Sequence, residues 1–264
     1  MSKLVAVLTG VLVVALHATG WSKCPPDMVA VGPTCVDKYE ASVWRLPAGN
    51  NRLANKVKKG MVTLGDLQTG GAEQVSTSGS PDQPCDRPYP ATFPPSGEWS
   101  EPLYAISVAG VLPTGCTSWF QAEQACRISG KRLPTNQEWQ AAASGTPKPM
   151  NLPDNPLPEC NVDRGRADTT GLSTACVSRW GAADMIGNVA EWVAQWVPSG
   201  TACPGWGSFA SDLMCMAGAS ETDGPGALVR GGTSSSATLA GSFAVVTSRP
   251  SGGDAASSGF RCAR

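Results

Sequence analysis

The chain has 264 residues, enough for one large domain or two small ones with a sizeable buried core. Its formal charge is −1 and only 16% of its residues are charged, so its composition indicates neither a nucleic-acid partner nor an anionic membrane surface. The 30 glycines and 22 prolines predict a loop-rich fold with few helices.

The first residues have the pattern of a secretory signal peptide. Lys3 precedes an apolar run from Leu4 to Leu16, and small residues suited to cleavage stand before Trp21. The run is too short for a comfortable membrane span. We therefore expect a signal peptide over residues 1–20, a mature chain over 21–264 without a membrane span, and a secreted or periplasmic location.

The numbers of cysteines and histidines limit the kinds of catalytic and metal site that the mature chain can form. It would keep all 10 cysteines, an even number that predicts about five disulfides in an oxidising compartment. The single histidine, His17, lies within the expected signal peptide. A mature chain without histidine has no Ser-His-Asp triad, no Cys-His dyad and no zinc site built on imidazole.

Residues 28–43 alternate apolar and polar positions and predict two short strands joined by a turn. Two acids, Asp37 and Glu40, lie in this segment. Pairing with Lys38 or with an arginine is the expected role of both acids, and a functional role is the alternative.

Residues 45–115 are rich in Pro, Gly, Ser, Asn and Lys and predict an irregular surface insertion. Short strands are expected only around Met61–Leu64 and Leu103–Val108. The lysine-rich stretch Lys56–Lys59 is expected to be a solvated loop.

Two helices are expected in the next part of the chain. Thr117–Arg127 has hydroxyl residues at its start that can cap a helix, followed by an apolar side. Thr135 stands three residues before Glu138, which is the spacing of a capping box, so a second helix should run to about Ala143.

Three later stretches predict short strands, namely Ala227–Gly232, Phe243–Thr247 and Phe260–Ala263. The sequence has no repeat of fixed period and no clear linker. We therefore expect one domain.

The stretch Asp184–Val193 (DMIGNVAEWV) concentrates oxygen donors. Asp184 and Glu191 bracket a Gly-Asn turn that can direct backbone carbonyls inward between two carboxylates. Calcium takes six to eight oxygens from such groups. Spacing alone nevertheless favours a plain loop that enters a strand with Trp192 and Val193 buried, because short acidic motifs often match by chance.

Four segments in this order resemble the formylglycine-generating enzyme family, also called sulfatase-modifying-factor domains. They are MVAVGPTCVDKYEAS, SWFQAEQACRISGKRLPTNQEWQAAA, GAADMIGNVAEWV, and LVRGG followed by GFRCAR. The resemblance implies an α+β domain related to C-type lectins over residues 21–264, loop-rich, with short strands and few helices. It also implies a disulfide between Cys126 and Cys262.

The resemblance makes calcium the expected cofactor. The family loop corresponding to Asp184–Val193 binds calcium through four positions, which here are Asp184, Gly187, Val189 and Glu191. A second family site has its first half in Asn161 and Val162, with Asp168 as a partner at a shortened spacing.

The chain departs from the family where the resemblance places catalysis. Family enzymes oxidise a sulfatase cysteine to formylglycine with copper held by two cysteines, and thiolates suit the soft copper(I) ion. Those positions are Ser236 and Gly241 here, and residues 233–242 contain no cysteine. We therefore expect no copper.

These observations predict a secreted, calcium-stabilised, non-catalytic or divergent binding or structural module whose ligand is a protein, peptide or glycan. Its recognition surface would lie on the loop 231–241, Trp192, Trp196 and the irregular insertions. Packing in the core is the alternative role of these tryptophans; it is the expected role of Trp192 and stays open for Trp196, Trp206 and Trp99. The alternative is a metal-dependent oxidoreductase that converts a sulfatase cysteine to formylglycine. That alternative could use copper at Cys203 and Cys215 if they did not form a disulfide.

Overall fold

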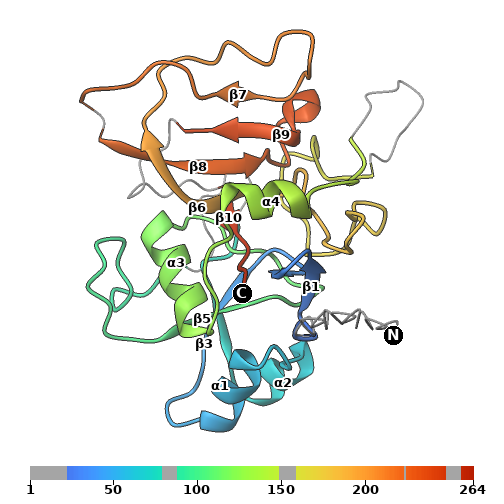
Figure 1. Cartoon of the computed structure of the whole chain (residues 1–264). Helices are drawn as coiled ribbons and strands as arrows, with labels where there is room; N and C mark the ends of the chain where they lie inside the picture. The colour runs from blue at the N-terminus through green and yellow to red at the C-terminus, as the bar shows by residue number, and fades with distance from the viewer. Residues whose placement is uncertain (1–22, 79–87, 149–158, 223, 248–256) are drawn as a thin grey trace, which may run out of the picture.

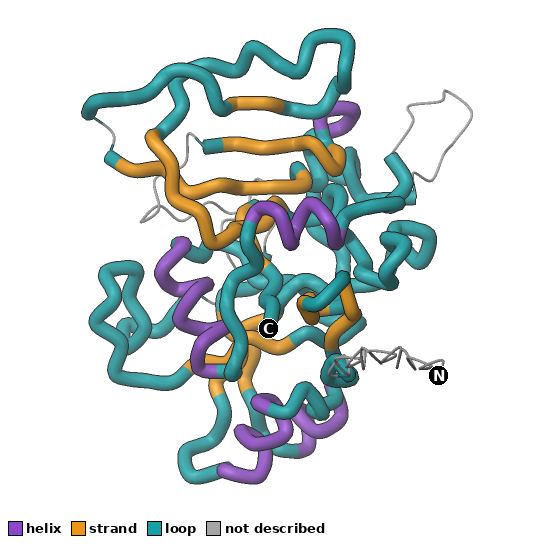
Figure 2. The backbone as a smooth tube through the Cα atoms, viewed as in Figure 1, coloured by secondary structure: helices purple, strands orange, loops and turns teal. Residues whose placement is uncertain are grey.

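The computed structural model describes most of the chain, namely residues 23–78, 88–148, 159–222, 224–247 and 257–264. The expected signal peptide, 1–20, lies outside this part. The described residues form several small sheets and short helices joined by long loops, which confirms the loop-rich α+β prediction (Figure 2). No helix among them combines the length and apolarity needed to cross a bilayer.

A five-stranded sheet occupies the upper part of Figure 1, with strand order β10-β6-β8-β9-β7. Its strands are β6 Ala190–Pro198, β7 Met214–Cys215, β8 Pro225–Gly231, β9 Gly241–Val246 and β10 Ser258–Phe260. The central pairs β6–β8 and β8–β9 are antiparallel, whereas β10 and β7 pair in parallel with their neighbours. Strands β8 and β9 confirm the strands expected over Ala227–Gly232 and Phe243–Thr247, whereas the strand expected over Phe260–Ala263 is displaced toward the N-terminus, because β10 ends at Phe260.

The N-terminal part forms a hairpin and a three-stranded sheet. The hairpin strands β1 Met28–Val31 and β2 Thr34–Asp37 are antiparallel, as the alternating pattern predicts. The sheet has the order β4-β3-β5, with β3 Ser42–Arg45, β4 Glu73–Val75 and β5 Leu103–Ile106.

The two expected helices are present and begin at the predicted signals. Helix α3, Trp119–Ile128, is capped by Ser118, and helix α4, Asn136–Ala142, is capped by Thr135. In each, the cap hydroxyl accepts a backbone N–H and the side chain three residues later closes the capping box. Helix α4 crosses in front of the five-stranded sheet (Figure 1).

The expectation of an irregular insertion over 45–115 is wrong in part: β5 confirms the strand expected around Leu103–Val108, but the segment also contains β4 and two helices. Helix α1, Asn51–Lys58, includes part of the supposed solvated loop, and helix α2, Leu64–Thr69, replaces the strand expected at 61–64. The physical reason is local: Leu53 and Val57 are four residues apart and both buried, so they face the core from one side of α1.

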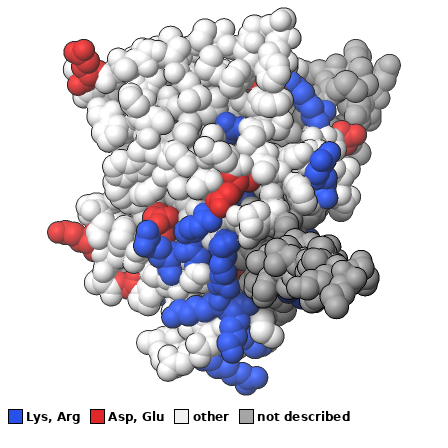
Figure 3. All heavy atoms as spheres, in the orientation of Figure 1, with Lys and Arg blue, Asp and Glu red and all other residues white. Residues whose placement is uncertain are grey.

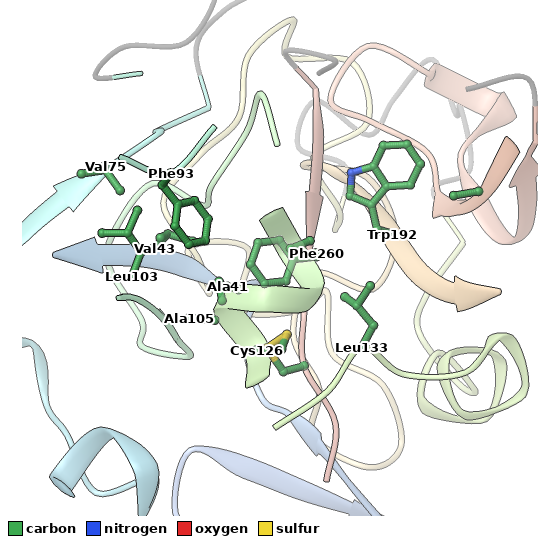
Figure 4. Packing of buried hydrophobic residues seen from close by; sticks show 14 of the residues in the cluster. Ala41, Val43, Val75, Phe93, Leu103, Ala105, Cys126, Leu133, Trp192 and Phe260 are labelled. Carbon is green, nitrogen blue, oxygen red and sulfur yellow. A yellow bond between two sulfur atoms is a disulfide. The ribbon is translucent and has the colours of Figure 1, made fainter. Parts of the chain in front are cut away.

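The main hydrophobic core joins the two halves of the molecule. Figure 4 shows Val43 and Leu103 of the smaller sheet on one side and Trp192 of β6 on the other, with Phe260 of β10 between them. Trp192 is fully buried, as predicted, and its indole N–H donates to the Thr117 carbonyl at 2.9 Å. Complete burial of one such side chain contributes about 1.5–3 kcal/mol.

Disulfides add covalent links to this core. The bond between Cys126 and Cys262, which the resemblance implies, is present and joins α3 to the C-terminal segment. The other bonds between described residues are Cys24–Cys35, Cys160–Cys176 and Cys203–Cys215. Every cysteine in the described part of the chain is disulfide-bonded.

We predict that replacing Cys126 and Cys262 together by Ala lowers the free energy of unfolding by about 5 kcal/mol, because the bond closes a loop of 136 residues. The matched control replaces Cys24 and Cys35, whose separation of 11 residues corresponds to about 3 kcal/mol. Equilibrium urea unfolding measures both. A larger loss from the control pair would contradict the prediction.

Candidate functional site

The acidic loop predicted from sequence folds back sharply before β6. Asp184, Gly187 and Asn188 all have positive φ angles, of 57°, 78° and 58°. At Gly187 the constraint is also steric, since a Cβ there would lie 2.2 Å from the carbonyl oxygen of Asn161. Only glycine allows this close approach.

The loop is tied to the two other predicted segments by backbone hydrogen bonds. The Asn188 N–H donates to the Asn161 carbonyl at 2.7 Å, and the Gly187 N–H donates to the Gly231 carbonyl at 3.3 Å. In the opposite direction, the Ser234 N–H donates to the Asn188 carbonyl at 3.0 Å. Segments far apart in sequence therefore meet at one point.

Glu191 forms a buried ion pair with Arg261. The Arg261 Nε lies 2.9 and 2.8 Å from the two carboxylate oxygens, and its second guanidinium nitrogen donates to Oε1 at 2.6 Å. The Trp139 indole N–H donates to Oε2 at 2.6 Å. Both side chains are essentially inaccessible to solvent. The Glu191 carboxylate is therefore committed to Arg261 and Trp139, which leaves it little capacity to act as the predicted calcium ligand.

Two further carboxylates lie beside this pair without a cation of their own. Glu40 accepts from the Asn188 side chain at 2.5 Å and from the Val189 N–H at 3.0 Å, and Asp184 accepts from the Gly171 N–H at 2.6 Å. Burial raises the pKa of Asp184 to about 6 and raises the pKa of Glu40 well above its usual range, and neighbouring carboxylates add to the increase for Glu40. The cluster thus places three buried carboxyl groups, of which Glu191 alone forms an ion pair with Arg261.

The second predicted set is also brought together. The Asn161 side-chain nitrogen donates to the Asn188 Oδ1 at 3.0 Å, and the Asp168 N–H donates to that oxygen at 2.8 Å. Asn161 Oδ1 is buried and accepts no hydrogen bond. The Val162 carbonyl accepts from the Ala237 N–H at 2.7 Å, and the Asp168 carboxylate pairs with Arg164.

These donors fit a hard cation only in part. An unsatisfied amide oxygen and uncompensated carboxylates are features that a calcium ion would relieve. However, no group of three or more acidic, cysteine or histidine side chains within the described ranges is arranged to hold a metal. A cation would therefore depend on Asn161 Oδ1 and backbone carbonyls as well as on Asp184 or Asp168.

Sequence reasoning missed Glu40 and Arg261 as members of this cluster. Glu40 was expected to pair with Lys38 or an arginine, yet it forms no ion pair with any residue that the structure describes. Asp37 pairs with buried Lys131 at 2.5 Å, whereas Lys38 lies over the Tyr39 ring. Both missed residues belong to segments that carry the family resemblance, KYEAS and GFRCAR, and that was the available signal.

The turn after β8 and the start of β9 contain Ser236 and Gly241, the positions that the resemblance assigns to copper cysteines. Ser236 Oγ accepts from the Thr233 N–H at 2.9 Å. A Cβ at Gly241 would lie 2.0 Å from Asp212 Oδ2, so the carboxylate of Asp212 fills the space of a side chain there. That carboxylate accepts from the Phe243 N–H at 2.9 Å and pairs with Lys148.

Exposed aromatic side chains occur in two clusters, and Trp180, which is 40% exposed, belongs to neither. Trp196 is 43% exposed and packs edge-on against Trp119 and Phe120, with ring centroids 5.0 and 5.3 Å away. The other cluster comprises Trp206, Phe209 and Phe243 near the start of β9. Of the two tryptophans considered for the recognition surface, Trp196 is therefore exposed and Trp192 is buried.

We predict that Arg261→Gln lowers the free energy of unfolding by about 3–5 kcal/mol, because it leaves Glu191 buried beside two other carboxylates without a counter-charge. Arg264→Gln is the matched control. Arg264 is exposed and only donates to two backbone carbonyls, so its loss should cost about 1 kcal/mol or less. Urea unfolding at neutral pH distinguishes the two, and equal small losses would show that the buried pair does not stabilise the fold.

Comparison with known proteins agrees with this architecture. Serine/threonine-protein kinase pkn1 of Chlamydia pneumoniae is 36% identical over 98 residues, which cover 36% of this chain and 15% of that protein. Inactive C-alpha-formylglycine-generating enzyme 2 of Mus musculus is 30% identical over 130 residues, 42% of this chain and 38% of that protein. The chain thus matches well under half of the length of these relatives.

Among solved structures, the Major Tropism Determinant U1 variant superposes with a TM-score of 0.50 at 18% identity, covering 91% of this chain and 52% of that one. This likeness concerns the fold alone, which is of the formylglycine-generating-enzyme and C-type-lectin-like type. The family model described as "Sulfatase-modifying factor enzyme 1-like domain" matches residues 96–264, more than half of the chain. The chain therefore belongs to the sulfatase-modifying-factor (formylglycine-generating enzyme) family.

Proposed function

We propose that this protein is a secreted or periplasmic, calcium-stabilised binding module that retains the sulfatase-modifying-factor scaffold without its oxidase chemistry. Its ligand would be a protein, a peptide or a glycan. The disulfides support a location in an oxidising compartment. One relative with 30% identity is itself named as inactive, which supports the non-catalytic part of the proposal.

The observation that carries the proposal is the contact between Gly241 and Asp212. A cysteine at 241 would need its Cβ within 2.0 Å of the Asp212 carboxylate, so that carboxylate would have to move before a thiolate could be placed there. The other family position, Ser236, carries a hydroxyl that is already hydrogen-bonded within the turn. Oxygen donors replace the soft sulfur pair that copper(I) prefers.

Cys203 and Cys215, the other sulfur pair considered for copper, are joined to each other in a disulfide. A disulfide offers no thiolate to a metal. The oxidoreductase alternative therefore has no sulfur ligand pair among the described residues.

Calcium would stabilise the region where the acidic loop, the segment at Asn161 and the turn after β8 are joined by backbone hydrogen bonds. The proposed donors of one site are Asp184 with the carbonyls of Gly187 and Val189, Glu191 being held by Arg261. Those of the other site are Asn161, Val162 and Asp168. A bound divalent cation would neutralise the surplus buried carboxylate charge and satisfy Asn161 Oδ1, which has no donor.

The first test is catalytic. We expect that the purified protein, incubated with copper(I) and a peptide carrying a Cys-x-Pro-x-Arg motif, forms no aldehyde detectable by mass spectrometry. The physical reason is the missing thiolate pair. Aldehyde formation would overturn the non-catalytic proposal in favour of the oxidoreductase.

A grafting experiment tests the steric argument. Ser236→Cys combined with Gly241→Cys should lower the free energy of unfolding by about 1–3 kcal/mol, because the new Cβ overlaps the Asp212 carboxylate. Adding Asp212→Gly should recover part of that loss by removing the overlapping group. A double variant as stable as the wild type would show that Asp212 does not block the position.

Thermal unfolding with and without a chelator tests calcium. At calcium concentrations near one hundred times Kd, binding contributes about 2.7 kcal/mol, and for a domain of this size that raises the Tm by about 5–10 °C. Asn161→Ala should reduce this increase, whereas Asn55→Ala, on the exposed side of α1, should not. An unchanged Tm on chelation would count against both sites.

A further inference from the structure

A pocket of about 630 Å³ lies between α4 and the start of β9, apart from the proposed calcium donors. Its polar lining is rich in amides and hydroxyls, contributed by Asn136, Gln137, Gln140, Ser144 and Ser242, and Phe243 completes one side. None of its lining residues carries a charge. Figure 3 shows that the upper part of this face has few charged side chains, while Lys and Arg gather lower down.

A buried guanidinium lies directly behind this lining. Arg230 is only 5% exposed, and it donates to the Gln140 Oε1 and, at 2.9 Å, to the Ser242 carbonyl. The guanidinium carbon, Cζ, lies 4.9 Å from the centroid of the Trp139 ring. The Arg230 Nε is buried without an acceptor, and no described carboxylate lies within ion-pair distance.

No carboxylate in the described part of the chain therefore pairs with this cation. Burial lowers the pKa of Arg230 to about 10, which still leaves it charged at neutral pH, and Asp212 only partly offsets the effect. Asp212 itself pairs with Lys148. A buried charge without a partner is costly, so the pocket next to it has a positive potential that favours an anion.

Gln140 connects Arg230 to the pocket, because it accepts a hydrogen bond from Arg230 and also lines the pocket. Because its carbonyl oxygen accepts from Arg230, its amide nitrogen is left as the group that can interact with a ligand. Arg230 thereby fixes a donor, rather than an acceptor, on the pocket lining. A carboxylate accepts such hydrogen bonds and is stabilised by the nearby positive charge.

An aromatic wall adjoins the polar lining. Phe243 is 38% exposed and Phe209 66% exposed, and their ring centroids are 5.0 Å apart. Trp206 packs at 6.5 Å from Phe243 and donates its indole N–H to the Phe243 carbonyl. Apolar ring faces beside convergent polar groups are the usual composition of a small-molecule site.

We propose that this pocket binds an acidic saccharide, a sugar unit that carries a carboxylate. The carboxylate would accept a hydrogen bond from Gln140 and be stabilised by the positive charge of Arg230. The sugar hydroxyls would hydrogen-bond to Asn136, Gln137 and Ser242. The C–H face of the sugar ring would pack on Phe243. An acidic peptide fits less well, because the Phe243 N–H donates to Asp212, while the Ser242 and Phe243 carbonyls accept from Arg230 and Trp206, so these backbone groups of β9 are not free to pair with an extended chain. This inference rests on the binding role proposed above.

Isothermal titration calorimetry on the full protein tests the proposal with two matched pairs of probes: trigalacturonate against its methyl ester, and sialyllactose against its methyl ester. We expect at least one acid to bind at least about tenfold tighter than its neutral counterpart, and this preference to weaken as salt is added. Gln140→Leu and Phe243→Ala should each weaken that binding about tenfold or more. The matched controls Gln68→Leu and Leu172→Ala, which change exposed residues outside the pocket, should not.

Absence of binding, equal binding of acid and neutral forms, or insensitivity to Gln140→Leu and Phe243→Ala would overturn the proposal. Tighter binding of hexaglutamate than of either acidic saccharide, lost in the same two variants, would also overturn it in favour of an acidic peptide. The aldehyde and chelator measurements are independent of all these results. Failure here is therefore distinguishable from failure of the non-catalytic, calcium-stabilised function.

Discussion

The ion pair between Glu191 and Arg261 is the interaction on which the rest of the structure depends. Glu191 lies in β6 and Arg261 follows β10, and the same guanidinium donates to the carbonyls of Asp37 and Ala183 at 3.0 and 2.9 Å. Removing two charges from water costs several kcal/mol for each ion, and only close geometry with satisfied hydrogen bonds offsets that cost. The N-terminal hairpin, the acidic loop and the C-terminal segment are thus held in one arrangement.

Near this pair, three segments that are far apart in the sequence lie side by side. The loop that enters β6, the segment at Asn161 and the turn after β8 remain joined by backbone hydrogen bonds. Within that turn, however, the Asp212 carboxylate fills the space that a side chain at Gly241 would need. That carboxylate pairs with Lys148.

Local signals in the sequence were sufficient to predict those helices and strands that are stabilised by hydrogen bonds between nearby residues. The capping boxes at Ser118 and Thr135 and the alternating strands of the N-terminal hairpin depend only on nearby residues. Helix α1 was not predicted, because its apolar side consists of only two residues, Leu53 and Val57, among charged and polar residues. The pairing of Asp37 with Lys131 could not be predicted from spacing, since 94 residues separate them.

The sequence by itself determined the loop-rich α+β class, the family, the position of the acidic loop and the absence of cysteine from residues 233–242, because each depends on residue types in a fixed order. The tertiary structure decided which charges are neutralised. It committed Glu191 to Arg261, left Glu40 and Asp184 without a cation, and buried Arg230 behind an uncharged pocket. The physical reason is that the energy of a charge depends on its burial and its neighbours, and folding brings these together from distant parts of the chain.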